Sequence, residues 1–343
     1  MADMKTDDIS PIIREKAPLI LAEIDKAKSI LLHCHPSPDP DSVGSALAMK
    51  FALEGMGKKV TVIKGDSEIP HGYRSFPGVD SIISKNFSEV NLKEFDLFIS
   101  LDSAEERLIS RFHPPTFPLS IRSVVIDHHP TNRGYADLNL VEPSYPSVCQ
   151  ILFEIFGVWN LAITPEIAKN LFIGLYTDSG GLKYPQTTTK TFAIASELTR
   201  IAPDFSEIIS QVENTNTPGF ILFEGIALSS VETFFNGQLA VSVVPYSKIK
   251  ENNISTDDVR AGEIATWMRT VPEWKVVVAM IECEPGKIRL SSRTLHPEKY
   301  DVSKLMSAIG GGGHKAAAAA IVSKPFEEIK QLVVSKAKEL YNL

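Results

Sequence analysis

Cysteine is scarce in this chain, and its positions exclude several classes of protein. Only three cysteines occur among 343 residues, at Cys34, Cys149 and Cys283, far apart and odd in number. This spacing provides neither a paired zinc-binding motif nor a disulfide framework. A secreted fold held together by disulfides is therefore excluded, and the three separate cysteines favour a protein of the reducing cytoplasm.

The sequence also lacks an excess of positive charge. It has 35 lysines and arginines against 42 acidic residues, which gives a formal net charge of −7. There is no long basic stripe and no alternation of basic and aromatic residues of the kind that binds long nucleic acids. A polyanionic substrate would have to bind at a local site that carries its own cations.

Long apolar runs are missing as well. No uninterrupted stretch is long enough to span a bilayer, and the segment Met1–Lys16 is charged and lacks the apolar core of a signal peptide. These absences predict a protein that does not insert into a membrane. The length of 343 residues, of which 43% are hydrophobic and 22% charged, indicates about two globular domains.

What the chain does contain is a set of apolar segments that end in acids or imidazoles. The clearest is the strand-like run 122–126, which leads directly into Asp127, His128 and His129 and then into a polar turn. In an open α/β sheet, binding sites lie just beyond the carboxyl ends of the strands. Taken alone, the triplet is equally compatible with a solvated loop that has no chemical role.

A second loop of this kind follows the first predicted strand. It carries His35, Asp39 and Asp41 within a stretch that holds three prolines. The prolines forbid helix in the loop, so the next helix is expected to begin with Asp41 or Ser42 as its N-cap. Two acids two residues apart, with a histidine four residues before the first, favour a metal site. A capping loop with incidental acids is the alternative.

The first half of the chain alternates between predicted strands and helices, which indicates a mainly parallel sheet. Asp102 follows the third strand. Asp178 follows a helix, where a carboxylate opposes the helix dipole and calls for a cationic partner. We predict strands at 29–32, 60–63, 95–101 and 122–126, and helices at 9–28, 42–55, 147–158 and 165–177.

The residue types at these positions suit divalent cations. Carboxylates and imidazoles without thiolates favour Mn²⁺ or Mg²⁺ over structural zinc. The acids are too many for one ion, whereas two ions about 3.5–4 Å apart that share a bridging carboxylate account for all of them. Such a pair activates a water molecule and neutralises phosphoryl oxygens. The candidate ligands are His35, Asp39, Asp41, Asp102, His128 and Asp178.

Four segments resemble, in order and spacing, the motifs of the DHH phosphoesterases. They are His35-x-x-Pro38-Asp39-Pro40-Asp41, Leu101-Asp102-Ser103, Asp127-His128-His129-Pro130-Thr131-Asn132 and Tyr176-Thr177-Asp178-Ser179-Gly180. This family includes RecJ-like nucleases, two-domain oligoribonucleases (nanoRNases) that also hydrolyse 3′-phosphoadenosine-5′-phosphate (pAp), cyclic-dinucleotide phosphodiesterases and manganese pyrophosphatases. Family members more often have glycine at the position of Pro40, a change that stiffens the loop without removing a ligand.

The resemblance implies a role for each of these residues. One ion would be held by His35, Asp39 and Asp102, and the other by Asp41, Asp102, His128 and Asp178. Asp102 would bridge the two ions, and His129 would face the scissile phosphate, so these two are the predicted catalytic residues. The implied cofactors are two Mn²⁺ ions, with Mg²⁺ or Co²⁺ as alternatives.

The second half contains a distinctive run of four glycines. Consecutive glycines let backbone N–H groups approach an anion closely, although a flexible turn is the alternative. The run resembles the glycine-rich motif of the DHH-associated C-terminal domain, and Arg293 resembles that domain's phosphate-binding arginine, a residue suited to bidentate contact. The resemblance implies the substrate-binding set Arg293, Gly310, Gly311, Gly312, Gly313 and His314.

The predicted architecture is α/β, with an N-terminal, mainly parallel DHH domain and a smaller mixed α/β C-terminal domain that enclose an active-site cleft. In the second half, strands are predicted at 239–244, 275–281 and 287–290, and helices at 262–270, 302–309 and 325–341. The predicted division is 1–195 for the DHH domain, 196–228 for a helical linker and 229–343 for the DHH-associated domain.

These features predict a manganese-dependent hydrolase that releases 5′-mononucleotides by attack of a metal-activated water. The expected partners are short RNA or DNA oligonucleotides or nucleotide bisphosphates such as pAp. No interaction with a membrane is expected, and the sequence leaves open whether the protein forms a homodimer. Alternatives are a pyrophosphatase or exopolyphosphatase, a cyclic or linear dinucleotide phosphodiesterase, and a nucleotide-binding protein without turnover. The six intact ligand positions argue against the last of these.

Overall fold

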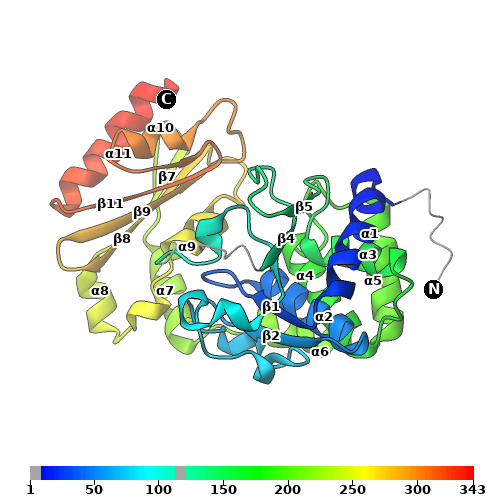
Figure 1. Cartoon of the computed structure of the whole chain (residues 1–343). Helices are drawn as coiled ribbons and strands as arrows, with labels where there is room; N and C mark the ends of the chain where they lie inside the picture. The colour runs from blue at the N-terminus through cyan, green and yellow to red at the C-terminus, as the bar shows by residue number, and fades with distance from the viewer. Residues whose placement is uncertain (1–8, 113–120) are drawn as a thin grey trace. The chain divides into compact units, whose positions relative to one another are not determined.

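The computed structural model describes residues 9–112 and 121–343. Within these residues the chain forms two compact units, one ending at Thr215 and the other beginning at Asn216 (Figure 1). The predicted α/β class is confirmed, because the first unit contains a parallel sheet and the second a mixed one. The range 196–228 holds parts of three helices, α5 (Thr189–Ile201), α6 (Phe205–Glu213) and α7 (Pro218–Ser229).

The first unit is built on a five-stranded sheet in which every pair of neighbours is parallel. The strand order is β2-β1-β3-β4-β5, with bounds β1 Ser29–His33, β2 Lys59–Ile63, β3 Leu97–Leu101, β4 Arg122–Asp127 and β5 Leu138–Val141. The four strands predicted in this half are confirmed. Strand β5 was not predicted, since Asn139 interrupts its short apolar run.

The strand order creates a topological switch between β1 and β3. Strand β1 pairs with β2 on one side and with β3 on the other, so the chain leaves these two central strands in opposite directions. A crevice opens outside the carboxyl ends of strands at such a point. The loop that follows β1 carries His35 and Asp39, Asp41 lies in the first turn of α2, and Asp102 follows β3 directly, so the topology brings these residues to one crevice.

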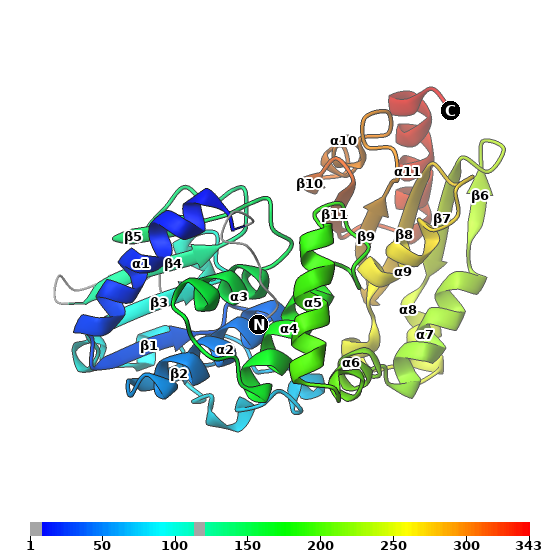
Figure 2. The ribbon, with the colours of Figure 1, turned by 90° about the vertical axis from the view of Figure 1, so that its right-hand side faces the viewer.

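Helices cover the larger hydrophobic face of this sheet. Their bounds are α1 Pro11–Lys26, α2 Pro40–Gly55, α3 Val148–Val158 and α4 Pro165–Asp178, followed by α5 and α6. Alternate strand residues such as Ile30 and Ile99 belong to the main core, whereas Leu31 and Phe98 belong to a smaller cluster, as the two-residue period of a strand requires. Figure 2 shows α2, α4 and α5 side by side in this unit.

Helix α2 begins two residues earlier than its predicted range. Pro40 is its first residue and Asp39 is its N-cap, whose side chain accepts a hydrogen bond from the Ser42 amide at 2.9 Å. The prediction that Asp41 or Ser42 caps the helix was wrong, because a proline at the first helical position loses no hydrogen bond and already has a helical φ. Asp41 therefore lies in the first turn, where it is buried.

Two glycines allow α2 and α4 to approach closely. A Cβ atom on Gly44 would lie 2.5 Å from the carbonyl oxygen of Asn170, and one on Gly174 would lie 2.7 Å from Asp41 Oδ1. Both distances are shorter than side chains tolerate, so only glycine fits at these crossings. The second contact also shows that Gly174 leaves the space that the Asp41 carboxylate occupies.

The second unit is built on a six-stranded mixed sheet in the order β10-β11-β9-β8-β7-β6, in which only β7 and β8 pair in parallel. The strands are β6 Glu232–Phe234, β7 Leu239–Val244, β8 Val276–Glu284, β9 Lys287–Arg293, β10 Gly312–His314 and β11 Ala317–Val322. The helices are α7, α8 Tyr246–Glu251, α9 Ala261–Met268, α10 Val302–Ser307 and α11 Phe326–Tyr341. Helices α10 and α11 contribute to one core cluster, and α7, α8 and α9 contribute to the other (Figure 1).

Strands β10 and β11 were not predicted, because glycine and alanine have little intrinsic preference for strands. Pairing with β9 overrides that propensity: Ala318 and Ala320 are buried in the core, and Ala319 is exposed. The register aligns His314 with Ala317 and Ala317 with Arg293. Arg293 and His314 therefore lie in one cross-strand row of the sheet.

We expect Gly44→Ala to destabilise the first unit by about 1–3 kcal/mol, because the added methyl group overpacks the crossing of α2 with α4. Differential scanning calorimetry of the full chain should show a lower unfolding midpoint for the first unit. Gly55→Ala is the matched control at the end of the same helix, where a Cβ atom meets no heavy atom within 4 Å. Equal midpoints for the two variants would contradict the close-packing argument.

Candidate metal centre

The first group of possible metal ligands comprises His35, Asp39 and Asp102. His35 Nε2 lies 3.4 Å from Asp39 Oδ2 and 3.4 Å from Asp102 Oδ2. The three ligand atoms lie within 4.8 Å of one another, close enough to hold one ion. Asp102 adopts a left-handed backbone conformation, with φ of 54°, as the chain turns out of β3. A non-glycine residue in that region is strained, and such strain concentrates at functional sites.

Asp102 faces a second histidine with its other oxygen. Asp102 Oδ1 lies 3.4 Å from His128 Nε2 and 3.7 Å from His129 Nδ1. The side chain is only 2% exposed, and Oδ1 has no hydrogen-bond partner among the described residues. Burying an anionic oxygen without a hydrogen bond is unfavourable, so the arrangement fits a bound cation. Asp102 therefore lies between His35, which is beside Oδ2, and His128, which is beside Oδ1.

The second group comprises Asp41, His128 and Asp178, whose ligand atoms also lie within 4.8 Å of one another. His128 Nε2 is 3.4 Å from Asp178 Oδ2, and Asp178 is the last residue of α4. The structure thus brings all six predicted ligands together from the ends of β1, β3 and β4, the start of α2 and the end of α4. These groups could hold metal.

Residues 145–149, at the start of α3, hold two members of this second group by hydrogen bonds. Asp41 Oδ2 accepts from the Val148 amide at 2.7 Å, and Asp41 Oδ1 accepts from the Cys149 amide at 3.0 Å. His128 Nδ1 donates to the Tyr145 carbonyl at 3.2 Å. Because a carbonyl only accepts, this bond leaves Nε2 as the nitrogen that faces the carboxylates.

The crowded acids have abnormal pKa values. Burial raises the pKa of Asp41 to about 7, with a further contribution from Asp102. Burial also raises the pKa of Asp178 to about 9, and Asp41 and Asp102 add to that effect. Each group resists ionisation because its neighbours are negatively charged and water is largely excluded. A cation would relieve that repulsion.

The histidines respond in the opposite direction. Burial opposes the charge on His35, but hydrogen bonds to Asp102 and Asp39 outweigh it and raise the pKa to about 11. Burial likewise opposes the charge on His128, yet Asp102 raises its pKa to about 10. For Asp102 itself, burial is outweighed by the two histidines, which hold its pKa well below the ordinary value. In the metal-free protein, these raised pKa values favour protonated imidazoles, whose positive charge offsets the negative charge of the carboxylates.

His129 is held differently from the ligands. Its side chain is 40% exposed, and Nδ1 donates to Asp127 Oδ1 at 2.8 Å. Asp127 is fully buried and also accepts from Asn132 Nδ2 at 2.8 Å. The hydrogen bond to Asp127 raises the pKa of His129. Asp127 and Asn132 were not among the predicted site residues, although both lie in the motif that contains His129.

The predicted substrate-binding residues lie in the second unit. Arg293 is half-buried, and its Nη1 donates to Ser291 Oγ at 3.1 Å and to the Ser292 carbonyl at 3.0 Å. Its Nη2 lies 3.6 Å from where a Cβ on Gly262 would be, in the first turn of α9, and no side chain caps that helix. A guanidinium beside the positive end of an uncapped helix favours an anion.

The amides of the four glycines have different surroundings. The Gly310 amide donates to the Ser307 carbonyl at 3.1 Å, and the Gly311 amide donates to the Met306 carbonyl at 2.8 Å. These two amides terminate α10, so the predicted anion pocket of four glycine amides needs correction. Gly312 and Gly313 lie in edge strand β10, where alternate amides point away from the neighbouring strand.

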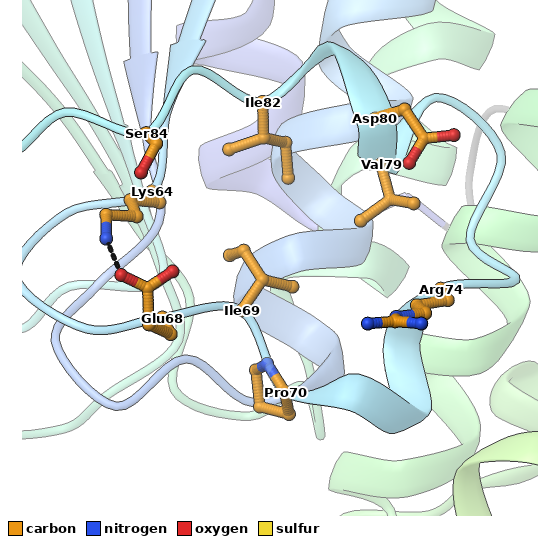
Figure 3. A pocket seen from close by; sticks show the side chains of 9 residues that line it. All are labelled: Lys64, Glu68, Ile69, Pro70, Arg74, Val79, Asp80, Ile82 and Ser84. Atoms are coloured by element: carbon orange, nitrogen blue, oxygen red, sulfur yellow. Dashed lines mark hydrogen bonds and ion pairs between the residues drawn. The ribbon is translucent and has the colours of Figure 1, made fainter.

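The structure contains a separate pocket of about 250 Å³ in the first unit, after β2 (Figure 3). Lys64 and Glu68 form an ion pair at its wall (Figure 3). The pocket is lined by Lys64, Glu68, Ile69, Pro70, Arg74, Val79, Asp80, Ile82 and Ser84. None of the predicted ligands or substrate-binding residues is among them, so this pocket plays no part in the metal centre.

Among the helices that the structure describes, none is both long and apolar enough to cross a bilayer.

Comparison with known families gives two matches. Residues 29–175 match the DHH family, N-terminal domain, and residues 236–342 match the DHHA1 domain. The first range contains five of the six possible ligands and ends three residues before Asp178. The second contains Arg293 and the glycine run.

Similar proteins span almost the same length. The chain is 26% identical over 304 residues to a probable bifunctional oligoribonuclease and PAP phosphatase NrnA of Streptococcus mutans, with 88% of this chain and 92% of that protein covered. It is 26% identical over 306 residues to the bifunctional oligoribonuclease and PAP phosphatase NrnA of Thermus thermophilus, covering 88% and 87%. A crystal structure of an exopolyphosphatase-related protein from Bacteroides fragilis has a TM-score of 0.81 at 21% identity, covering 98% and 99% of the two chains.

We expect Asp178→Asn to raise the unfolding midpoint of the metal-free protein at pH 8. The folded-state pKa of Asp178 is raised from 3.8 to about 9, so over that interval the unfolded chain releases a proton that the folded protein retains, and stability falls as pH rises. The neutral amide removes this effect and weakens any metal site. Thermal unfolding with a chelator, and then with Mn²⁺, measures both consequences.

The wild type should gain stability from Mn²⁺ by mass action, and Asp178→Asn should lose most of that gain. Asp80→Asn is the matched control, because Asp80 is an exposed acid of the same unit outside the metal centre. A lower midpoint for Asp178→Asn in chelator, or an undiminished response to Mn²⁺, would overturn the electrostatic account.

Proposed function

Because the chain belongs to the DHH family of phosphoesterases, with an N-terminal DHH domain and a DHHA1 domain, we propose that it is a metal-dependent hydrolase of short oligonucleotides and of pAp. The observation that carries the proposal is the convergence of six possible carboxylate and imidazole ligands, with Asp102 beside both His35 and His128. The oligoribonuclease and PAP phosphatase names of relatives that match this chain along most of its length support the substrate class.

We propose that the centre holds two ions. His35, Asp39 and Asp102 would bind one, and Asp41, Asp102, His128 and Asp178 would bind the other. Oxygen and imidazole donors without thiolates favour Mn²⁺, with Mg²⁺ or Co²⁺ as alternatives. When bound, such ions supply an activated water nucleophile and neutralise charge on the phosphoryl oxygens.

Among the residues that the structure describes, His129 is well arranged to act on the phosphate. Its Nδ1 is bonded to buried Asp127, so the ring is held in one orientation and Nε2 is left for the substrate. The hydrogen bond to Asp127 raises the pKa of His129, which favours the protonated ring, whose Nε2 can donate a hydrogen bond. A donor aimed at a phosphoryl oxygen stabilises the charge that develops during hydrolysis.

The second unit supplies groups suited to the rest of a nucleotide. We propose that Arg293 and His314 bind a substrate phosphate, assisted by the uncapped amides of α9. Their alignment in one row of the sheet, with only Ala317 between them, supports this role. Alanine there leaves room for an anion that contacts both side chains.

A panel of substrates tests the proposed function. With Mn²⁺, the protein should release 5′-mononucleotides from di- to pentanucleotides and adenosine monophosphate from pAp, with far less turnover of pyrophosphate. Asp102→Ala should lower kcat by at least about a thousandfold, because it removes the residue shared by both ligand groups. Products with 3′-phosphates, or pyrophosphate as the best substrate, would contradict the proposal.

Arg293→Ala should lower kcat/KM for pAp and dinucleotides by about tenfold to a thousandfold, because a charge-assisted contact contributes roughly 1.5–3 kcal/mol or somewhat more. Its metal content should stay at the wild-type level. Arg289→Ala is the matched control, since Arg289 is an exposed arginine four residues away on the same face of β9.

A small chromogenic phosphodiester provides the internal reference for this variant. It is too short to need the Arg293 site, so wild type and Arg293→Ala should hydrolyse it at similar rates. Loss of metal in Arg293→Ala, or equal damage with both kinds of substrate, would show that the arginine does not serve in substrate binding.

A further inference from the structure

A buried ionic network adjoins the second group of ligands without contributing a ligand itself. Lys190 Nζ lies 2.9 Å from Glu154 Oε1 and donates to the Tyr145 hydroxyl at 2.7 Å. The Tyr145 hydroxyl donates to Glu154 Oε2 at 2.8 Å. Glu154 is fully buried, and the lysine ammonium also lies 5.0 Å from the centre of the Tyr145 ring. The three side chains form a closed triangle.

The position of Lys190 is unusual for a helix. It is the second residue of α5, where the positive end of the helix dipole disfavours a lysine. Glu154 is equally unusual, because it is the one charged residue of α3, a helix that is apolar apart from Glu154 and Gln150. The Glu154 carboxylate offsets the unfavourable interaction of Lys190 with the dipole of α5, and the Lys190 ammonium offsets the cost of burying Glu154. The pair therefore ties the start of α5 to the middle of α3, two helices that lie side by side (Figure 2).

The network reaches the metal centre through Tyr145. The Tyr145 carbonyl accepts from His128 Nδ1 at 3.2 Å, while its hydroxyl is held by Lys190 and Glu154. Glu154 lies in the same helix whose first amides bind Asp41. One short segment, residues 145–149, thus orients both His128 and Asp41. Neither His35 nor Asp39 contacts this segment through any described hydrogen bond or ion pair.

We propose that Lys190, Glu154 and Tyr145 are positioning residues that hold His128 and Asp41, which bind only one of the two proposed ions, and that they do not hold His35 and Asp39, which bind only the other. The proposal rests on the proposed two-ion centre. Outer partners of metal ligands fix the orientation of the ligand ring, and their removal weakens metal binding by about tenfold to a hundredfold. The expected consequence is a selective loss of one ion.

Calorimetric titration of the metal-free full chain with Mn²⁺ tests this selectivity. Wild type should bind two ions, and Lys190→Met should weaken one of them by about tenfold to a hundredfold while the other changes less than about twofold. Lys190→Arg, which keeps the cation, should restore most of the lost affinity. Lys169→Met is the matched control, since it removes another helical lysine and its ion pair with Asp204.

Tyr145→Phe provides a second variant that keeps the packed ring and both charges. It should weaken the binding of the same ion by a smaller factor. If Lys190→Met does not fold, Tyr145→Phe still tests whether the network positions one group of ligands. Equal weakening of both ions, or no weakening in either variant, would overturn the positioning role. A wild type that binds no Mn²⁺ would instead overturn the proposed function, so the two failures are distinguishable.

Discussion

Four carboxylates converge at the carboxyl edge of the parallel sheet, and their mutual repulsion is the constraint on which the first unit depends. Each is accommodated differently. Asp39 caps α2 and stays partly exposed, and Asp41 is buried but receives two amides from the start of α3. Asp102 lies between His35 and His128, each at 3.4 Å. Asp178 is the last residue of α4, where the helix dipole disfavours a carboxylate, and His128 Nε2 lies 3.4 Å from it.

The sequence was sufficient to predict that the six candidate ligands lie close together, because each of them lies near the end of an apolar strand or at the start or end of a helix. The parallel topology then requires loops after β1, β3 and β4 to meet, as they do. The start of α2 could not be predicted in the same way, since prolines were weighed as helix breakers although Pro40 occupies the one helical position that suits it. The network of Lys190, Glu154 and Tyr145 was also out of reach, because its members come from three elements and no short motif joins them.

In the second unit, pairing rather than propensity decides the structure. A run of glycines and alanines carries no period and little preference for strands, so neither β10 nor β11 was predicted. Once β11 pairs with β9, the register determines which side chains share a face. That register, and not sequence proximity, brings His314 into the row of Arg293. Gly310 and Gly311 instead terminate α10, because their amides donate to carbonyls of that helix.

Pro40 shows how one residue can serve the fold and the centre together. It begins α2, so the residue before it takes the extended conformation of an N-cap and the residue after it enters the first turn. Asp39 and Asp41 thereby point in different directions: Asp39 lies beside His35, and Asp41 lies against the start of α3. Because φ of proline is nearly fixed, this divergence is built into the chain before any ligand binds. The two acids are consequently assigned to different ligand groups by backbone geometry, and Gly174 in α4 supplies the space that the buried member requires.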